Sequence, residues 1–205
     1  YKPRSFFEGV TMIGNESLLR RLTLSLAGRL PTAKEKQTVQ KKSLAGLDAI
    51  LEKLMTEEAF YGRLKEGFND IFLTDGYDGN GELILSYDHF EKTRHWYKKH
   101  DFSQIEGKRE RQEALWEMAR VYRKAIRSEP LELIAHVVRN DRPFTEIMTA
   151  NYMMVSPYSA RGYGIFDQVK DRFKDVENPF EYVPAKLPAL KNKQGKAQES
   201  KTGFY

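Results

Sequence analysis

The chain has 205 residues, of which 40% are hydrophobic and 12% aromatic, a composition typical of globular proteins and not of disordered chains. Its net charge of +5 lies mostly in residues 184–205, where five lysines outnumber one acid, so the nearly neutral body does not indicate a nucleic-acid partner. The absence of cysteine excludes disulfides, thiolate metal sites and a CxxCH site for covalent haem within these residues.

Apolar residues at helical spacing predict a first helix through residues 17–27, with Asn15 as its N-cap and Gly28 as its C-terminal stop. Thr32 and Glu35 have the spacing of a capping box, in which each side chain bonds the backbone N–H of the other residue. This pair predicts where the second helix begins.

Residues 47–54 and 60–72 continue the helical pattern, the second set with several phenylalanines, and should form the core of the first half. Residues 75–81 (DGYDGNG) then predict a loop, because glycine and aspartate favour turns. No segment shows sustained alternation of apolar and polar residues, so the only sheet expected is a small hairpin near residues 83–85.

Ser103 and Glu106 offer a further capping box and predict a long helix towards Arg127. Residues 128–130 (SEP) predict a new helix start, since proline is tolerated in the first helical turn. An apolar stripe over residues 131–138 supports that helix.

Residues 141–143 (DRP) predict another helix that runs through Tyr152, and Ser156 with Pro157 predict a short one after it. From Asn178 onward, prolines and polar residues with few apolar anchors are typical of an extended linker.

The predicted fold is therefore all-α: an irregular multi-helix bundle with an extended basic C-terminal tail. The helical domain is expected at residues 1–177, with sub-halves 1–82 and 83–177, and the linker or tail at residues 178–205. No apolar run reaches the roughly 20 residues that a membrane-spanning helix needs.

Three of the four histidines lie within twelve residues of one another, but their spacings of six and five do not match the HxxxH pattern of helical zinc sites. One of these histidines, or a methionine, could still serve as an axial ligand to a haem that another domain carries. The candidate ligands for it are His89, His95, His100 and Met153.

The loop at residues 75–82 supplies oxygen ligands that resemble part of a calcium loop, although the order of an EF-hand is not present. An irregular hard-cation site at Asp75, Asp78, Asn80 and Glu82 stays open beside the simpler interpretation as a turn. No catalytic residue can be assigned from sequence motifs, so whether the chain is an enzyme is left undecided.

Three blocks of sequence resemble a single group of proteins. Residues 21–32 (RLTLSLAGRLPT) and residues 51–76, which include AFYGR, resemble two segments of the cytochrome c-associated domains of unknown function that are abundant in planctomycetes. Residues 139–152 (RNDRPFTEIMTANY) are similar to a motif of sister domains in the same large proteins. Gly67 and Phe68 depart from the pattern, because the family often has tryptophan there. Phe144, within the third block, is expected on a core-facing stripe.

The resemblance implies a bacterial multidomain protein that is periplasmic, outer-membrane-associated or secreted and is commonly linked to c-type cytochrome modules. Because the chain begins with Tyr1, we also expect an upstream segment. No haem is expected to be bound covalently within this chain, and haem c would lie elsewhere in the parent protein. The expected partners are the remaining domains of the parent and c-type cytochromes, with no nucleic acid and no transmembrane segment.

Two functions follow from these expectations. In the first, the chain is a helical module of a larger c-type cytochrome-like protein and serves as a scaffold or docking surface for electron transfer. In the alternative, it shapes the substrate cleft of an extracytoplasmic oxidoreductase or hydrolase that acts on a polymer, with the candidate residues near the loop at 75–82.

Overall fold

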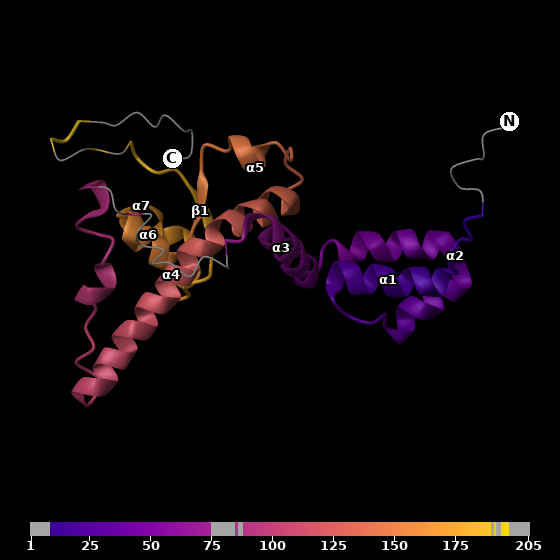
Figure 1. Cartoon of the computed structure of the whole chain (residues 1–205), viewed down its shortest axis with the longest axis horizontal. Coiled ribbons are helices and arrows are strands. Elements are labelled where there is room, and N and C mark those ends of the chain that lie inside the picture. Colours follow the sequence, from indigo (N-terminus) through magenta and orange to yellow (C-terminus); the bar gives the residue numbers. More distant parts are fainter. Residues whose placement is uncertain (1–8, 75–84, 86–87, 190, 192–193, 197–205) are drawn as a thin grey trace. The chain divides into compact units, whose positions relative to one another are not determined.

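The computed structural model describes residues 9–74, 85, 88–189, 191 and 194–196. Within these residues the chain is mostly helical, with helices α1 to α7, short 3₁₀ helices and one two-stranded sheet (Figure 1). The predicted all-α fold class is confirmed. The chain divides into two compact units, Tyr1–Gly67 and Phe68–Tyr205.

The first unit contains α1 (Asn15–Ala27), α2 (Ala33–Leu54) and the start of α3 (Glu58–Phe72). Its apolar core is formed by Leu19, Ala27, Val39, Leu47, Ile50 and Leu54. The predicted cap at Asn15 is wrong, because Gly14 takes the N-cap position and Asn15 is already helical. Gly28 ends α1 as predicted, with a left-handed backbone (φ 63°) that a residue without a Cβ adopts at little cost.

The capping box at the start of α2 is confirmed. The Thr32 hydroxyl accepts a hydrogen bond from the Glu35 N–H at 3.2 Å, and the Thr32 N–H donates to Glu35 Oε2 at 2.7 Å. Arg29 binds the same carboxylate at 2.8 Å and reaches Glu57 at 3.3 Å. The Arg29 hydrogen bond lowers the pKa of Glu35 to about 2, so this carboxylate stays ionised and tied to both partners at neutral pH.

Replacing Thr32 with alanine should destabilise the protein by about 1 kcal/mol, because the Glu35 N–H loses its acceptor. Thr38→Ala is the matched control. The Thr38 hydroxyl is exposed and bonds the Lys34 carbonyl within the helix, so its loss should change the free energy of unfolding by less than about 0.5 kcal/mol. Urea unfolding of both variants measures the difference, and equal losses would show that the cap does not stabilise α2.

The second unit is built around the long helix α4 (Lys108–Arg139), against which β1 and α6 pack (Figure 1). Its other elements are η2 (Asp88–Phe90), η3 (Trp96–Lys99), α5 (Glu146–Thr149), β1 (Met153–Val155), α6 (Pro157–Tyr163), α7 (Phe166–Val169), η4 (Lys170–Arg172) and β2 (Val183–Ala185). Its core includes Tyr122 and Ile126 of α4 with Val155, Ala160 and Tyr163.

The predicted new helix start at residues 128–130 is wrong, because α4 continues through Pro130. Proline has no N–H to donate to the carbonyl of the residue four positions earlier, which normally breaks or kinks a helix. Here the residues on both sides of Pro130 are buried on α4, among them Ile126, Leu131 and Ile134. Tertiary packing of these side chains therefore outweighs the local cost of the proline.

The start of α4 also differs from the prediction. The helix begins at Lys108, after Gly107, and Ser103 does not cap it. Instead the Ser103 N–H and hydroxyl both bond the carboxylate of Asp101, at 2.8 and 3.1 Å. A short side chain that bonds its own local backbone can favour a turn over a helix start.

The helix predicted from residues 141–143 through Tyr152 is mostly absent, because only the short α5 forms. The chain then extends into β1, which pairs antiparallel with β2 so that Met153 faces Ala185 and Val155 faces Val183. Apart from Leu85, the predicted hairpin near residues 83–85 lies outside the described residues. Phe144 was expected on a core-facing stripe, and this prediction is wrong, because its side chain is 62% exposed.

The short helix predicted at Ser156 and Pro157 is confirmed as α6. The Ser156 and Ser159 side chains form a capping box at its start, and Gly164 ends it with φ 72°. Both serines are fully buried, so this cap holds α6 in the core beside α4.

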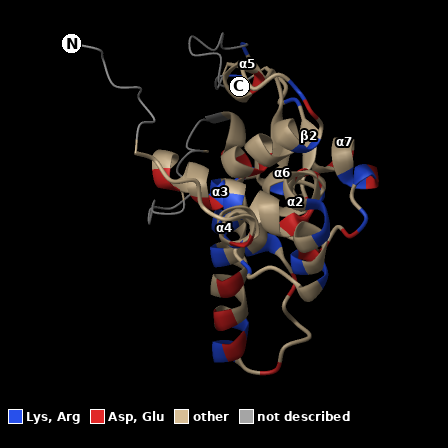
Figure 2. Cartoon of the chain, turned by 90° about the vertical axis from the view of Figure 1, so that its right-hand side faces the viewer, with Lys and Arg blue, Asp and Glu red and all other residues tan. Residues whose placement is uncertain are grey.

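Charged side chains of both signs are mixed along the first half of α4 (Figure 2). Among them Arg109 bonds Glu113 and Arg120 bonds Glu117 on the helix surface. Such exposed pairs contribute little to stability and indicate a solvated face. None of the described helices combines the length and the apolar character needed to cross a membrane.

Candidate functional site

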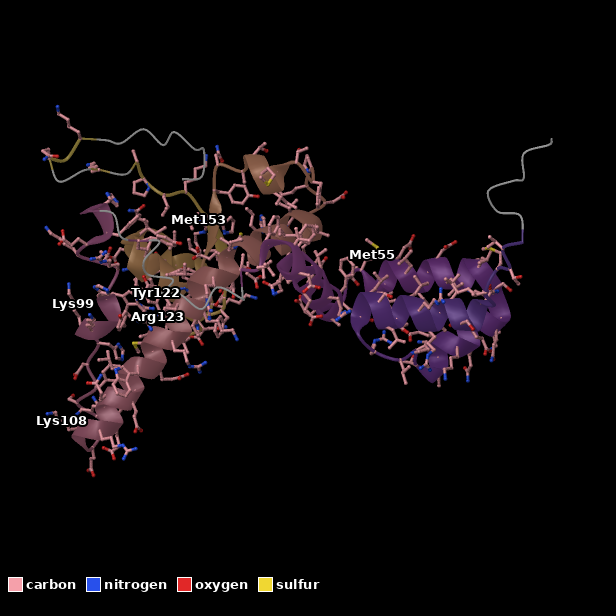
Figure 3. The ribbon with its side chains drawn as sticks, in the orientation of Figure 1. Met55, Lys99, Lys108, Tyr122, Arg123 and Met153 are labelled. Atoms are coloured by element: carbon pink, nitrogen blue, oxygen red, sulfur yellow. The ribbon has the colours of Figure 1, made fainter. Side chains whose placement is uncertain are left out.

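The second unit contains an apolar cavity of about 330 Å³ between α4, α5, β1 and α6. It is lined by Leu85, Phe90, Ile126, Glu129, Pro130, Leu133, Met148, Ala150, Asn151, Tyr152, Met153, Met154, Tyr163 and Leu187. The lining is mainly aliphatic, aromatic and thioether side chains. Figure 3 shows Met153, one of these residues, on β1 beside α4.

Glu129 is the only carboxylate among the described residues that line the cavity, and it is just 5% exposed. The Tyr163 hydroxyl of α6 donates a hydrogen bond to Glu129 Oε2 at 2.6 Å. The second oxygen, Oε1, is buried and has no hydrogen-bond partner within the described part of the chain. A buried polar atom without a partner is costly, and a catalytic role or a bound molecule is one of the explanations for its presence in a folded protein.

Burial raises the pKa of Glu129 to about 8, because the low-dielectric surroundings disfavour the charged form. The hydroxyls of Ser159 and Tyr163 lower this pKa but do not offset the burial. Burial and the neighbouring Glu129 raise the pKa of Tyr163 well above its usual value. At neutral pH the pair is therefore mainly an uncharged carboxylic acid beside an uncharged phenol.

Helical spacing places Glu129 at the cavity. Ile126, Glu129, Pro130 and Leu133 stand at i, i+3, i+4 and i+7 on α4, which is one face of a helix, and all four line the cavity. This site is not predicted from the sequence, because residues 128–130 have the pattern of a helix start, where an acid is ordinary. The sequence feature that could have indicated the site is Glu129 itself, a single acidic residue inside an otherwise apolar helical stripe.

The histidines and the methionine considered as haem ligands do not meet at one place. Met153 lines the cavity, but none of the histidines does. His89 accepts a hydrogen bond from the Lys191 N–H at 3.2 Å, while His95 and His100 border two separate surface hollows. Within the described residues no group of three or more histidines, aspartates or glutamates could hold a metal ion.

The loop residues considered for cation binding lie outside the described residues, namely Asp75, Asp78, Asn80 and Glu82. The hard-cation site therefore remains a prediction from sequence.

A second cluster surrounds Arg161 on α6. Its guanidinium lies over the Phe166 ring at 4.1 Å and the Trp96 ring at 5.2 Å, and it bonds the Glu177 carboxylate at 3.3 Å. Cation–π contacts of this kind hold neighbouring elements together. The aromatic residues around Arg161 thus pack within the unit, which leaves the Glu129 cavity as the stronger candidate site.

Fold and cavity together define a helical protein whose second unit encloses a pocket of small-molecule size. Residues 87–165 match the family described as PSD4, protein of unknown function (DUF1592). The matched segment contains α4, β1 and α6, and therefore both Glu129 and Tyr163. It also includes the sequence block at residues 139–152. The chain has no match among curated proteins or solved structures.

Proposed function

We propose that the chain is a helical module of a larger extracytoplasmic protein of the c-type cytochrome kind, in which it acts as a scaffold and docking surface for an electron-transferring domain. The resemblance of residues 21–32, 51–76 and 139–152 to cytochrome c-associated domains supports this role. In this proposal haem c lies elsewhere in the parent protein, which resides in the periplasm, at the outer membrane or outside the cell.

The structural observation that carries the proposal is an exposed aromatic patch on the second unit, defined by Phe68, Phe72 and Phe144. The Phe68 ring lies 6.0 Å from both other rings, and Phe72 and Phe144 are 46% and 62% exposed. Contiguous exposed apolar surface is uncommon on proteins that act alone and often marks an interface. Aromatic side chains are enriched at such interfaces, and electron-transfer complexes use small ones.

Hydrogen exchange tests the docking role. Backbone amides of residues 68–74 and 141–150 should exchange more slowly in the parent protein than in the separate 205-residue chain, because the aromatic patch is covered only in the parent. Amides near Trp116, which is 65% exposed on α4, provide the control and should exchange equally in both samples. Equal exchange at the patch would contradict docking there.

A reduced-minus-oxidised visible spectrum of the native parent, taken with its intact mass, tests the electron-transfer part separately. We expect a mass greater than 23.9 kDa together with c-type haem bands. If the parent protein lacked these bands, its proposed role in electron transfer would be wrong, while a docking role of the chain would be unaffected.

A further inference from the structure

We propose that the cavity around Glu129 binds a small, largely apolar molecule that carries one uncharged hydrogen-bond acceptor, such as a ketone oxygen, and that the Glu129 carboxyl group donates a hydrogen bond to this acceptor. This inference concerns a different surface from the aromatic patch and stands independently of the docking role.

The walls of the cavity select for apolar character and limited size. Phe90, Ile126, Leu133, Met153 and Met154 line a volume of about 330 Å³. This volume lies at the small end of the range for small-molecule sites, which are typically lined by apolar side chains with a few placed polar groups. A polymer chain would not fit inside, whereas a molecule with one or two rings would.

The hydrogen bonding of Glu129 defines the polar group of the ligand. Tyr163 already donates to Oε2, so the carboxyl proton of the uncharged acid belongs on Oε1. Oε1 is buried without a partner within the described part of the chain, and Glu129 lines the cavity. The Glu129 carboxyl group therefore offers one hydrogen-bond donor, and a ligand that brings an acceptor completes it.

The charges around the cavity favour an uncharged ligand. Tyr152 and Tyr163 are the only other titratable side chains among the described lining residues, and burial raises the pKa of both. Ser159, on α6, is the remaining polar neighbour that affects Glu129. With the carboxyl group uncharged below about pH 8, nothing described at the site balances the charge of a cationic amine or of an anion.

Three probes with the same two rings test the proposal, namely benzophenone, diphenylmethane and benzhydrylamine. At about pH 6 benzophenone should bind the full chain roughly tenfold more tightly than diphenylmethane, because only the ketone accepts a hydrogen bond from the Glu129 carboxyl group. Irradiation of bound benzophenone should crosslink it to peptides that contain Met148, Met153 or Met154. Equal binding of ketone and hydrocarbon, or crosslinks confined to other peptides, would overturn the proposal. Tightest binding of the amine would overturn the uncharged ligand class.

Two variants separate the donor from the shape of the cavity. Glu129→Gln keeps an N–H donor and should retain the preference for benzophenone. Glu129→Met removes the donor and should bind benzophenone only as well as diphenylmethane.

Raising the pH provides a readout that does not depend on the folding of Glu129→Met. Above about pH 8 the wild-type preference for benzophenone should disappear as Glu129 ionises, whereas in Glu129→Gln it should persist. A preference that responds to pH in the same way in both proteins would show that Glu129 does not recognise the ligand.

Discussion

Replacing Glu129 with glutamine is expected to remove a steep pH dependence from the free energy of unfolding. The pKa of Glu129 rises from an ordinary value of 4.5 to about 8 in the folded protein. Between these values the folded state holds a proton that the unfolded state has released, so the stability of the wild-type protein falls as pH rises. The full difference corresponds to roughly 5 kcal/mol, at about 1.4 kcal/mol for each pH unit.

The sign of this effect follows from the raised pKa. Below about pH 4.5 the carboxyl group is uncharged in both states and burial costs little, whereas above about pH 8 the folded state must hold a buried charge. Glutamine is uncharged throughout, so the variant should lose the slope even if its amide adds a constant penalty.

Guanidinium unfolding at several pH values from about 5 to 8 measures the slope. Glu113→Gln is the matched control, since Glu113 is an exposed residue of the same helix that pairs only with Arg109 in the described structure. This control should keep the wild-type slope. If wild type and Glu129→Gln had parallel profiles, the carboxyl group would be ionised in the folded protein and the assignment of Oε1 as a donor would be wrong.

Gly162→Ala should destabilise the protein by about 3 kcal/mol through overpacking of the core. A Cβ at Gly162 would lie 1.9 Å from the Tyr122 hydroxyl oxygen and 2.7 Å from the ring carbon that carries it. Tyr122 is fully buried, and its ring packs at 5.7 Å from Trp96 and 5.9 Å from Tyr97. Because the ring has no free space, the added methyl group must displace α6 or α4.

The same substitution at Gly62 is the control for this prediction. Gly62 lies within α3, and a Cβ there would meet nothing within 4 Å. Gly62→Ala should therefore stabilise the helix by about 0.5 to 1 kcal/mol. In a Tyr122→Phe background, Gly162→Ala should cost measurably less than in the wild type, because the closest clashing atom is gone. Urea unfolding of the four variants tests both statements, and losses of the same size at both glycines would contradict the packing argument.

Features set by neighbouring residues were predicted well. The capping box of Thr32, the short helix at Ser156 and the stop at Gly28 each depend on hydrogen bonds or backbone angles within one helical turn. The predicted cap at Ser103 failed because Asp101 offers the same serine a competing local partner. The predicted core position of Phe144 is wrong because the expected helix through Tyr152 does not form; only the one-turn α5 does, and the exposed Phe144 precedes it.

The sequence by itself determined the helical class and three helix ends, at Gly28, Thr32 and Ser156, since apolar periodicity and caps act over a few residues. Only the tertiary structure decided three other features. These are the passage of α4 through Pro130, the pairing of β1 with β2, and the burial of Glu129 against Tyr163. Glu129 and Tyr163 are 34 positions apart, and no local pattern brings their side chains together. The candidate site arises from this contact because packing of α4 against α6 removes the carboxyl group from water, in a side chain that lines an apolar cavity and keeps one buried oxygen without a partner in the described part of the chain.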